Sequence, residues 1–320
     1  MAMPWLKVLI LALLPLSVEA AQFAYITNQG AHNVSVIDVA KMQVTSTVPV
    51  GKGPVGVAVN NSANRVYISN VDGRSITVLN MLTNDQLAEI PLDIAPFGLA
   101  LSKSGAHLFV ADWFHDRILV LSTQTLKIEH EILSSGHAPA GLVLSREGAS
   151  LYVANRDSND VSVIDTRSFK ETTRIPVGLH PFGMTLGGEG RNLYVVNVES
   201  NTISVIDTHR DIVTGSIAVG EHPYCVASNT DGTRIYVTNT GEDSFSVIDP
   251  KAGKTLAKLA SGGTPEGIAY DNQRQQIYVV SWMDDSVSVF DATNFQRLKV
   301  IQTGSKSRAF GQFMASPSMQ

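Results

Sequence analysis

This sequence of 320 residues has few of the features that usually reveal a function. Its one cysteine, Cys225, cannot form an internal disulfide, and the apolar stretch around it predicts a buried structural thiol. Charged residues make up only 17% of the chain and the net charge is −5, so nothing indicates the basic face of a nucleic-acid-binding protein. No nucleophile elbow, His-Glu-x-x-His motif, cysteine pair or phosphate-cradling loop occurs, and no catalytic residue is assigned.

Long apolar runs are confined to the N-terminus. Lys7 precedes an apolar run from Val8 to Leu16, which is too short for the roughly 20 residues that span a bilayer. The pattern predicts a signal peptide over residues 1–20, cleaved before Ala21. We therefore expect an exported protein, periplasmic or secreted, without a transmembrane anchor.

A motif of four residues that starts with an aromatic side chain recurs seven times. The aromatic positions are 42, 42, 43, 42, 42 and 42 residues apart, at Tyr25, Tyr67, Phe109, Tyr152, Tyr194, Tyr236 and Tyr278. Each copy is followed by a run in which β-branched residues alternate, at residues 34–38, 76–80, 118–122, 161–165, 203–207, 245–249 and 287–291. Alternation with a period of two indicates β-strands.

Two further runs complete each repeat. The third run is exemplified by residues 45–50 and 173–177. The fourth follows a Pro-x-Gly step, at residues 54–56, 96–98, 139–141, 181–183 and 265–267, with Cys225 in place of the glycine at 223–225. Four short antiparallel strands in about 40 residues are typical of a propeller blade. We predict an all-β, seven-bladed β-propeller with four antiparallel strands per blade, forming a single domain over residues 21–320.

The repeated motifs resemble those of the YVTN-repeat β-propeller family, whose members include YncE-like proteins. The resemblance covers residues 23–314 and implies the propeller fold. It does not imply one activity, since related propellers serve many functions.

The order of the strands predicts how the ring closes. We name the strand after Pro-x-Gly strand a, the strand of the aromatic motif strand b, and the next two strands c and d. The mature chain begins at a strand b, and residues 308–314 resemble a strand a in which Ala309 replaces proline. We therefore expect this C-terminal inner strand to join the N-terminal blade, residues 23–50, and to remove an open edge.

Some recurring polar and small residues have a structural interpretation. Asparagine ends most copies of the aromatic motif and aspartate ends most c strands, and both residue types are expected to bond to nearby backbone amides and to start turns. The glycine of Pro-x-Gly is expected to allow close packing between blades.

The d–a and b–c loops supply the candidate binding residues, because they meet at one end of the channel. Trp113 and Trp282 occupy equivalent positions in two b–c loops, where they serve ligand contact or local packing. The other candidates on this face are His115, Arg117, His137, His180, His222, Lys306 and Arg308.

Two groups of these candidates have alternative interpretations. The four histidines, with Glu199 or Glu221, could hold zinc or copper, or could be ordinary polar loop residues, so no metal ligand is assigned. Lys52, Lys306 and Arg308 could form a basic pocket for a carboxylate or phosphate, or a solvated basic edge.

The favoured function is an exported periplasmic binding or scaffold module that acts through this loop-rich face. Its partner would be a periplasmic protein, a glycan or a small molecule; we expect a monomer and no nucleic acid, and no cofactor is identified. The alternative is a propeller enzyme of the lactonase or lyase type. The resemblance also implies a possible place as an accessory protein of a quinone-cofactor-dependent periplasmic oxidation system.

Overall fold

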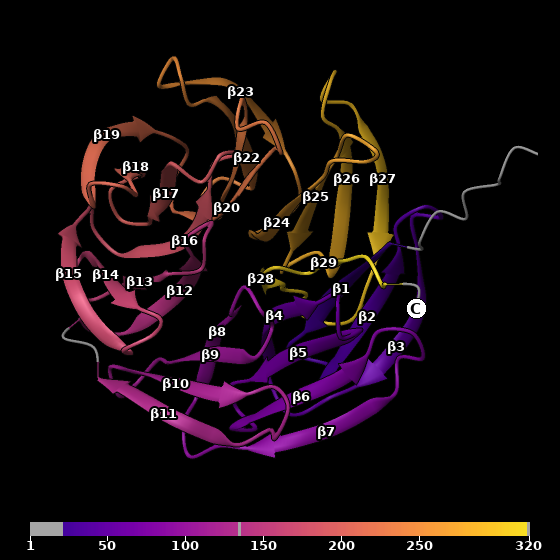
Figure 1. Ribbon diagram of the computed structural model, residues 1–320. Helices are drawn as coiled ribbons and strands as arrows, with labels where there is room; N and C mark the ends of the chain where they lie inside the picture. The colour runs from indigo at the N-terminus through magenta and orange to yellow at the C-terminus, as the bar shows by residue number, and fades with distance from the viewer. Residues whose placement is uncertain (1–21, 134–135, 319–320) are drawn as a thin grey trace, which may run out of the picture.

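The protein is a seven-bladed β-propeller whose blades surround a central channel (Figure 1). A computed structural model describes residues 22–133 and 136–318, and the predicted signal peptide lies outside these described residues. Every regular element in these two ranges is a β-strand. The same part of the chain contains no helix that could cross a membrane.

The strands nearest the channel and their partners follow the predicted order. Strand a of six blades is β4 (Pro54–Asn60), β8 (Pro96–Leu101), β12 (Pro139–Leu144), β16 (Pro181–Leu186), β20 (Pro223–Ser228) and β24 (Pro265–Asp271). Strand b is β1 (Phe23–Asn28), β5 (Arg65–Asn70), β9 (His107–Asp112), β13 (Ser150–Asn155), β17 (Asn192–Asn197), β21 (Ile235–Asn239) and β25 (Gln276–Ser281).

The outer half of each blade is a second antiparallel pair. Strand c is β2 (Asn33–Asp38), β6 (Ser75–Asn80), β10 (Arg117–Ser122), β14 (Asp160–Asp165), β18 (Thr202–Asp207), β22 (Ser244–Asp249) and β26 (Ser286–Asp291). Strand d, on the outside of the ring, is β3 (Gln43–Pro49), β7 (Gln86–Pro91), β11 (Ile128–Leu133), β15 (Lys170–Pro176), β19 (Ile212–Ala218), β23 (Lys254–Ala260) and β27 (Arg297–Gln302) (Figure 1).

Packing of blade against blade explains the composition of the strands. Strands b and c are buried along nearly their whole length, because the two faces of each blade are covered by the two neighbouring blades. The aromatic residues of the repeated motif are fully or almost fully buried, at Tyr25, Tyr67, Phe109, Tyr152, Tyr194, Tyr236 and Tyr278. Strand d exposes most of its residues, so the hydrophobic core lies between blades and toward the channel.

The glycine of Pro-x-Gly lies where adjacent inner strands approach each other. A Cβ atom on Gly98 would lie 1.9 Å from the carbonyl oxygen of Ala140 in the next blade. A Cβ atom on Gly141 would lie 2.2 Å from the carbonyl oxygen of Phe182, one blade further on. The interpretation of this glycine as a close-packing residue is confirmed.

The motif asparagines are structural, but their side-chain amides donate to side chains of strand c and not to the backbone amides that we expected. The side-chain amide of Asn155 donates to Asp160 Oδ1 and to Ser162 Oγ, both at 2.8 Å. Equivalent pairs of bonds are made by Asn28, Asn70, Asn197 and Asn239. At the other end of the blade, Asp165 accepts from the backbone N–H groups of the turn that follows it.

The C-terminal segment joins two blades. β29 (Met314–Ala315) pairs antiparallel with β1, while β28 (Phe310–Gly311) pairs in parallel with β4 and lies near the ring axis (Figure 1). One continuous strand over residues 308–314 was the wrong expectation, because Gly311 has a φ of 99° and turns the backbone between the two pairings. Phe313, between them, is fully buried.

Candidate binding site at the channel mouth

The mouth of the channel is the end at which the b–c and d–a turns gather. A repeated hydrogen bond fixes these turns: a b–c side chain accepts from the backbone N–H of the d–a residue 21 positions later, or 22 positions later for Asp116. The acceptors are His32, Asp116, Asn159, Asn201, Asp243 and Asp285. His180, His222 and Lys306 are among the donors, and all three have a positive φ. Their backbones are therefore held in place by the repeat itself.

Four aromatic rings from the inner strands pack together just inside the mouth; we call Phe97, Phe182, Tyr224 and Phe310 the aromatic plug. The first three are the middle residues of their Pro-x-Gly or Pro-x-Cys steps. Ring centroids lie 5.0 Å apart for Phe97 and Phe310, and 4.3 Å apart for Phe182 and Tyr224. Phe182 and Phe310 lie 5.2 Å apart. Tilted and edge-to-face pairs of this kind stabilise the cluster beyond the area they bury.

A buried ion pair lies beside the plug. Glu266, the middle residue of the step that starts β24, is 6% exposed, and the Arg308 side chain is 18% exposed. Arg308 Nη2 donates to Glu266 Oε1 at 2.9 Å, and Nε lies 2.9 Å from Oε2. Burial raises the pKa of Glu266 to about 7, although Arg308 acts in the opposite direction.

Two further titratable groups adjoin this pair. Burial raises the pKa of the Tyr224 hydroxyl and of the Cys225 thiol, and the negative charge of Glu266 adds to both effects. Arg308 and Arg156 favour the ionised Tyr224, so both guanidinium groups lie within electrostatic reach of its hydroxyl. The mouth thus gathers an acid, two cations and a phenol around an apolar floor.

Each candidate tryptophan lies beneath a cation. The ring of Trp113 packs on the plug, 4.6 Å from the Phe97 ring centroid, and Arg156 Cζ lies 5.6 Å from the Trp113 ring. Lys306 Nζ lies 5.1 Å from the Trp282 ring. The Trp282 indole N–H is buried and finds no hydrogen-bond partner among the described residues. Trp113 therefore packs on the plug, and each of the two tryptophan rings forms a cation–π contact at the mouth.

The four candidate histidines do not converge on one point, because each contacts its own turn or the adjacent one. His115, His137 and His180 each place Nδ1 near a carboxylate, at 2.9 Å from Asp112, 2.8 Å from Asp116 and 3.7 Å from Glu199. The backbone N–H of His222 bonds to its neighbouring b–c turn. Over residues 22–133 and 136–318, no group of three or more His, Cys, Asp or Glu side chains is placed to hold a metal ion.

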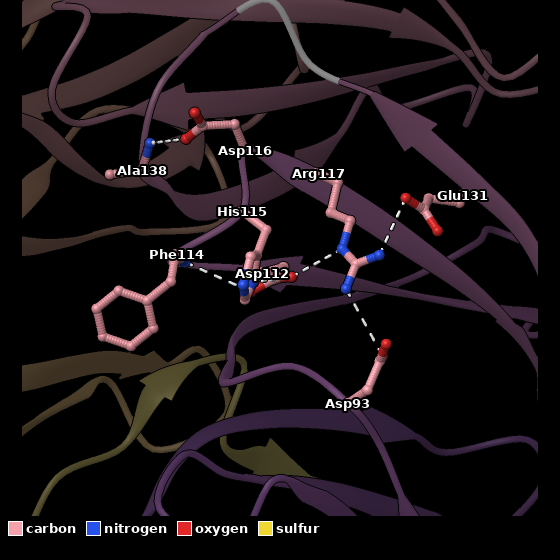
Figure 2. Close-up of polar contacts among 8 residues, drawn as sticks. All are labelled: Asp93, Asp112, Phe114, His115, Asp116, Arg117, Glu131 and Ala138. Carbon is pink, nitrogen blue, oxygen red and sulfur yellow. Dashed lines mark hydrogen bonds and ion pairs between the residues drawn. The ribbon is translucent and has the colours of Figure 1, made fainter.

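Arg117, in β10, forms ion pairs with residues of β9, of β11 and of the d–a turn that precedes β8. Its guanidinium lies 2.8 Å from Asp112, 3.0 Å from Glu131 and 3.6 Å from Asp93 (Figure 2). The hydrogen bond to the fully buried Asp112, with help from Glu131, raises the pKa of Arg117 above its ordinary value. Asp112 stands where most blades have asparagine, and it also bonds to His115 (Figure 2). This ion-pair network replaces the asparagine bonds of the other blades.

The sequence-based candidates did not include Glu266, Arg156 or Tyr224. A signal for Glu266 was present, because it is the single charged residue among the middle residues of the Pro-x-Gly steps. Arg156 directly follows a motif asparagine, at the position equivalent to Trp113 and Trp282. That equivalence could have identified it as a third mouth residue.

Comparison with known families gives a partial match. A family described as "Lactonase, 7-bladed beta-propeller" matches residues 93–169, about a quarter of the chain. This segment includes Trp113 and Arg156. No curated protein matches the chain.

Solved structures of similar fold cover most of the chain. Hydrazine synthase of Kuenenia stuttgartiensis is 18% identical, with a TM-score of 0.76, over 85% of this chain and 92% of its own. A functionally unknown protein from Desulfotomaculum acetoxidans DSM 771 is 13% identical, with a TM-score of 0.78, over 92% and 99%. The dihydro-heme d1 dehydrogenase NirN is 15% identical, with a TM-score of 0.71, over 96% and 78%. These likenesses show the fold.

Proposed function

We propose that this protein is an exported YVTN-type propeller of the periplasm that binds a small molecule at the channel mouth. The ligand would carry a carboxylate or another strong acceptor next to an apolar portion. The observation that carries the proposal is the buried pair of Glu266 and Arg308 beside the aromatic plug.

The fold itself does not require this ion pair. At the six equivalent inner positions the chain has uncharged residues, namely Val55, Phe97, Ala140, Phe182, Tyr224 and Phe310. A buried ion pair is often no more stabilising than apolar residues of the same volume, because both charges lose their hydration. A buried acid with a raised pKa and a specific charged partner is therefore a functional-site candidate.

The surroundings of the pair suit an acceptor group with an apolar neighbour. The Arg308 guanidinium has five N–H donors in a planar fork, and Glu266 accepts a hydrogen bond from one of them, at Nη2. Arg156 adds a second guanidinium above Trp113. Trp113 is partly exposed and rests on the buried Phe97 ring of the plug, so it supplies aromatic surface for the apolar part of the ligand.

A ligand screen on the mature protein tests this function. Thermal shift and titration calorimetry would compare aliphatic and aromatic carboxylates with their neutral amides, since a ligand of the native state raises the melting temperature. The Glu266→Gln/Arg308→Gln double variant avoids an unpaired buried charge and should weaken carboxylate binding at least tenfold. Lys251→Gln, in an exposed c–d turn at the other end of the blades, is the matched control and should bind normally. Equal binding by the double variant would refute the assignment.

Lactone hydrolysis is a second candidate function. The match of residues 93–169 to the lactonase family and the raised pKa of Glu266, at about 7, both favour it. A carboxyl group with a pKa near the working pH suits general acid–base catalysis. Proton release from a panel of lactones would detect turnover, and Glu266→Gln should abolish it. Turnover that survives this substitution would remove Glu266 from the reaction.

Export rests on the sequence of residues 1–20. Cell fractionation should place the protein outside the cytoplasm, and N-terminal sequencing should begin at Ala21. A cytoplasmic protein that retains Met1 would contradict this part of the proposal.

A further inference from the structure

A second hollow lies in the channel on the far side of the aromatic plug from the mouth. Its volume is about 500 Å3. Phe310 and Cys225 lie at its plug end, while Leu101, Leu144 and Tyr270 lie toward the a–b turns. The hollow therefore occupies the stretch of channel between the plug and the opposite end of the inner strands.

The lining of this cavity differs in character from the mouth. None of its lining residues carries a charge. Its larger side chains are apolar, including Leu99, Leu142, Met184 and Ile268. An ionic ligand would lose its hydration here without a counter-charge, which disfavours its binding. The cavity therefore favours a neutral occupant.

The backbone supplies hydrogen-bonding capacity in this otherwise apolar wall. β12, β16, β20 and β24 each pair with a neighbour on one side only, because they are terminal strands of their sheets. Their other edges lie toward the channel (Figure 1), so backbone N–H and C=O groups there can bond to a ligand. Gln312 and Thr185 add side-chain donors and acceptors.

We infer that this cavity is a binding site for a neutral, mostly apolar small molecule with one or two hydrogen-bonding groups. Its volume lies within the range of about 300–1,000 Å3 that small-molecule sites occupy. The plug separates it from the mouth, so it is distinct from the site of the proposed function. A charged ligand belongs at the mouth and a neutral ligand belongs here.

Nile red, a neutral apolar dye whose fluorescence rises in apolar surroundings, is the probe for the test. We expect saturable binding of one dye per protein. Ala227→Trp, which adds a large ring at a partly exposed lining position, should weaken binding at least tenfold. Ala252→Trp, at an exposed c–d turn, is the matched control and should leave binding unchanged. Arg156→Ala, at the mouth, should also leave it unchanged.

Cys225 provides an independent readout because it is the only cysteine and lines the cavity. Mass spectrometry would follow its alkylation by N-ethylmaleimide at mildly alkaline pH, and saturating dye should slow the reaction at least threefold. If Ala227→Trp fails to fold, this protection decides the question. The inference is overturned if dye binding is absent or non-saturable, if Ala227→Trp binds like the control, or if Cys225 is not protected.

Discussion

Replacement of Gly98 by alanine tests the packing of inner strands that defines the ring. The added Cβ atom would lie 1.9 Å from the carbonyl oxygen of Ala140, whereas such contacts are essentially never shorter than 3.0 Å. β8 and β12 would have to separate by about 1.1 Å, although each is held by its partner strand. The obstacle is backbone and cannot rotate away, so we expect a loss near or above the usual overpacking cost of about 1–3 kcal/mol.

Equilibrium unfolding in guanidinium chloride measures this loss directly. Gly215→Ala is the matched control, because a Cβ atom on Gly215 in the outer strand β19 would meet nothing within 4 Å. We expect the control to be neutral or slightly stabilising, since alanine restricts the unfolded chain. Equal unfolding midpoints for Gly98→Ala and Gly215→Ala would refute the close-packing argument.

Three further substitutions follow from the same structure. The pKa of Glu266 rises from 4.5 to about 7 on folding, so the unfolded chain loses this proton at lower pH than the folded chain does. The free energy of unfolding should therefore fall as the pH rises from about 4.5 to 7. Glu266→Gln should flatten this part of the plot of unfolding free energy against pH. Plots of unfolding free energy against pH that run parallel for the wild type and Glu266→Gln would contradict this prediction. Phe313→Ala should lower the free energy of unfolding in urea by about 3–5 kcal/mol, because the ring is fully buried where β1 meets the C-terminal segment. A loss below about 1 kcal/mol would show that this closure of the ring contributes little to stability. Asn155→Ala should lower the free energy of unfolding by about 1–3 kcal/mol and should speed amide hydrogen exchange at the end of β13. Unchanged exchange would argue against a stabilising role for the hydrogen bonds of the Asn155 side chain.

The repeat made most of the fold predictable. Spacing of about 42 residues and alternation with a period of two fix blade number and strand order, because each blade buries the same faces against its neighbours. The division of the C-terminal segment into β28 and β29 was not predictable in this way. It depends on the positive φ of Gly311, and only the two flanking blades impose that conformation.

The site was less predictable than the fold. Repeat spacing places His137 and His222 on the mouth face, but it does not give their contacts, such as the pairing of the His137 side chain with Asp116 in the adjacent b–c turn. Glu266 was detectable as the one charge among equivalent inner positions. Its pairing with Arg308 was not, because that contact depends on how the final segment turns beside β1 and β4.

The pairing of Ala24 with Met314 makes the two ends of the chain parts of one blade, 290 residues apart in sequence. Contacts of such long range slow folding, since they form only after the intervening chain is in place. During synthesis β1 emerges early and waits with an unpaired edge until the last few residues arrive. An unpaired edge invites pairing with other chains. The pairing of residues 310–311 with β4 and of residues 314–315 with β1 therefore covers strand edges that would otherwise be open to other chains.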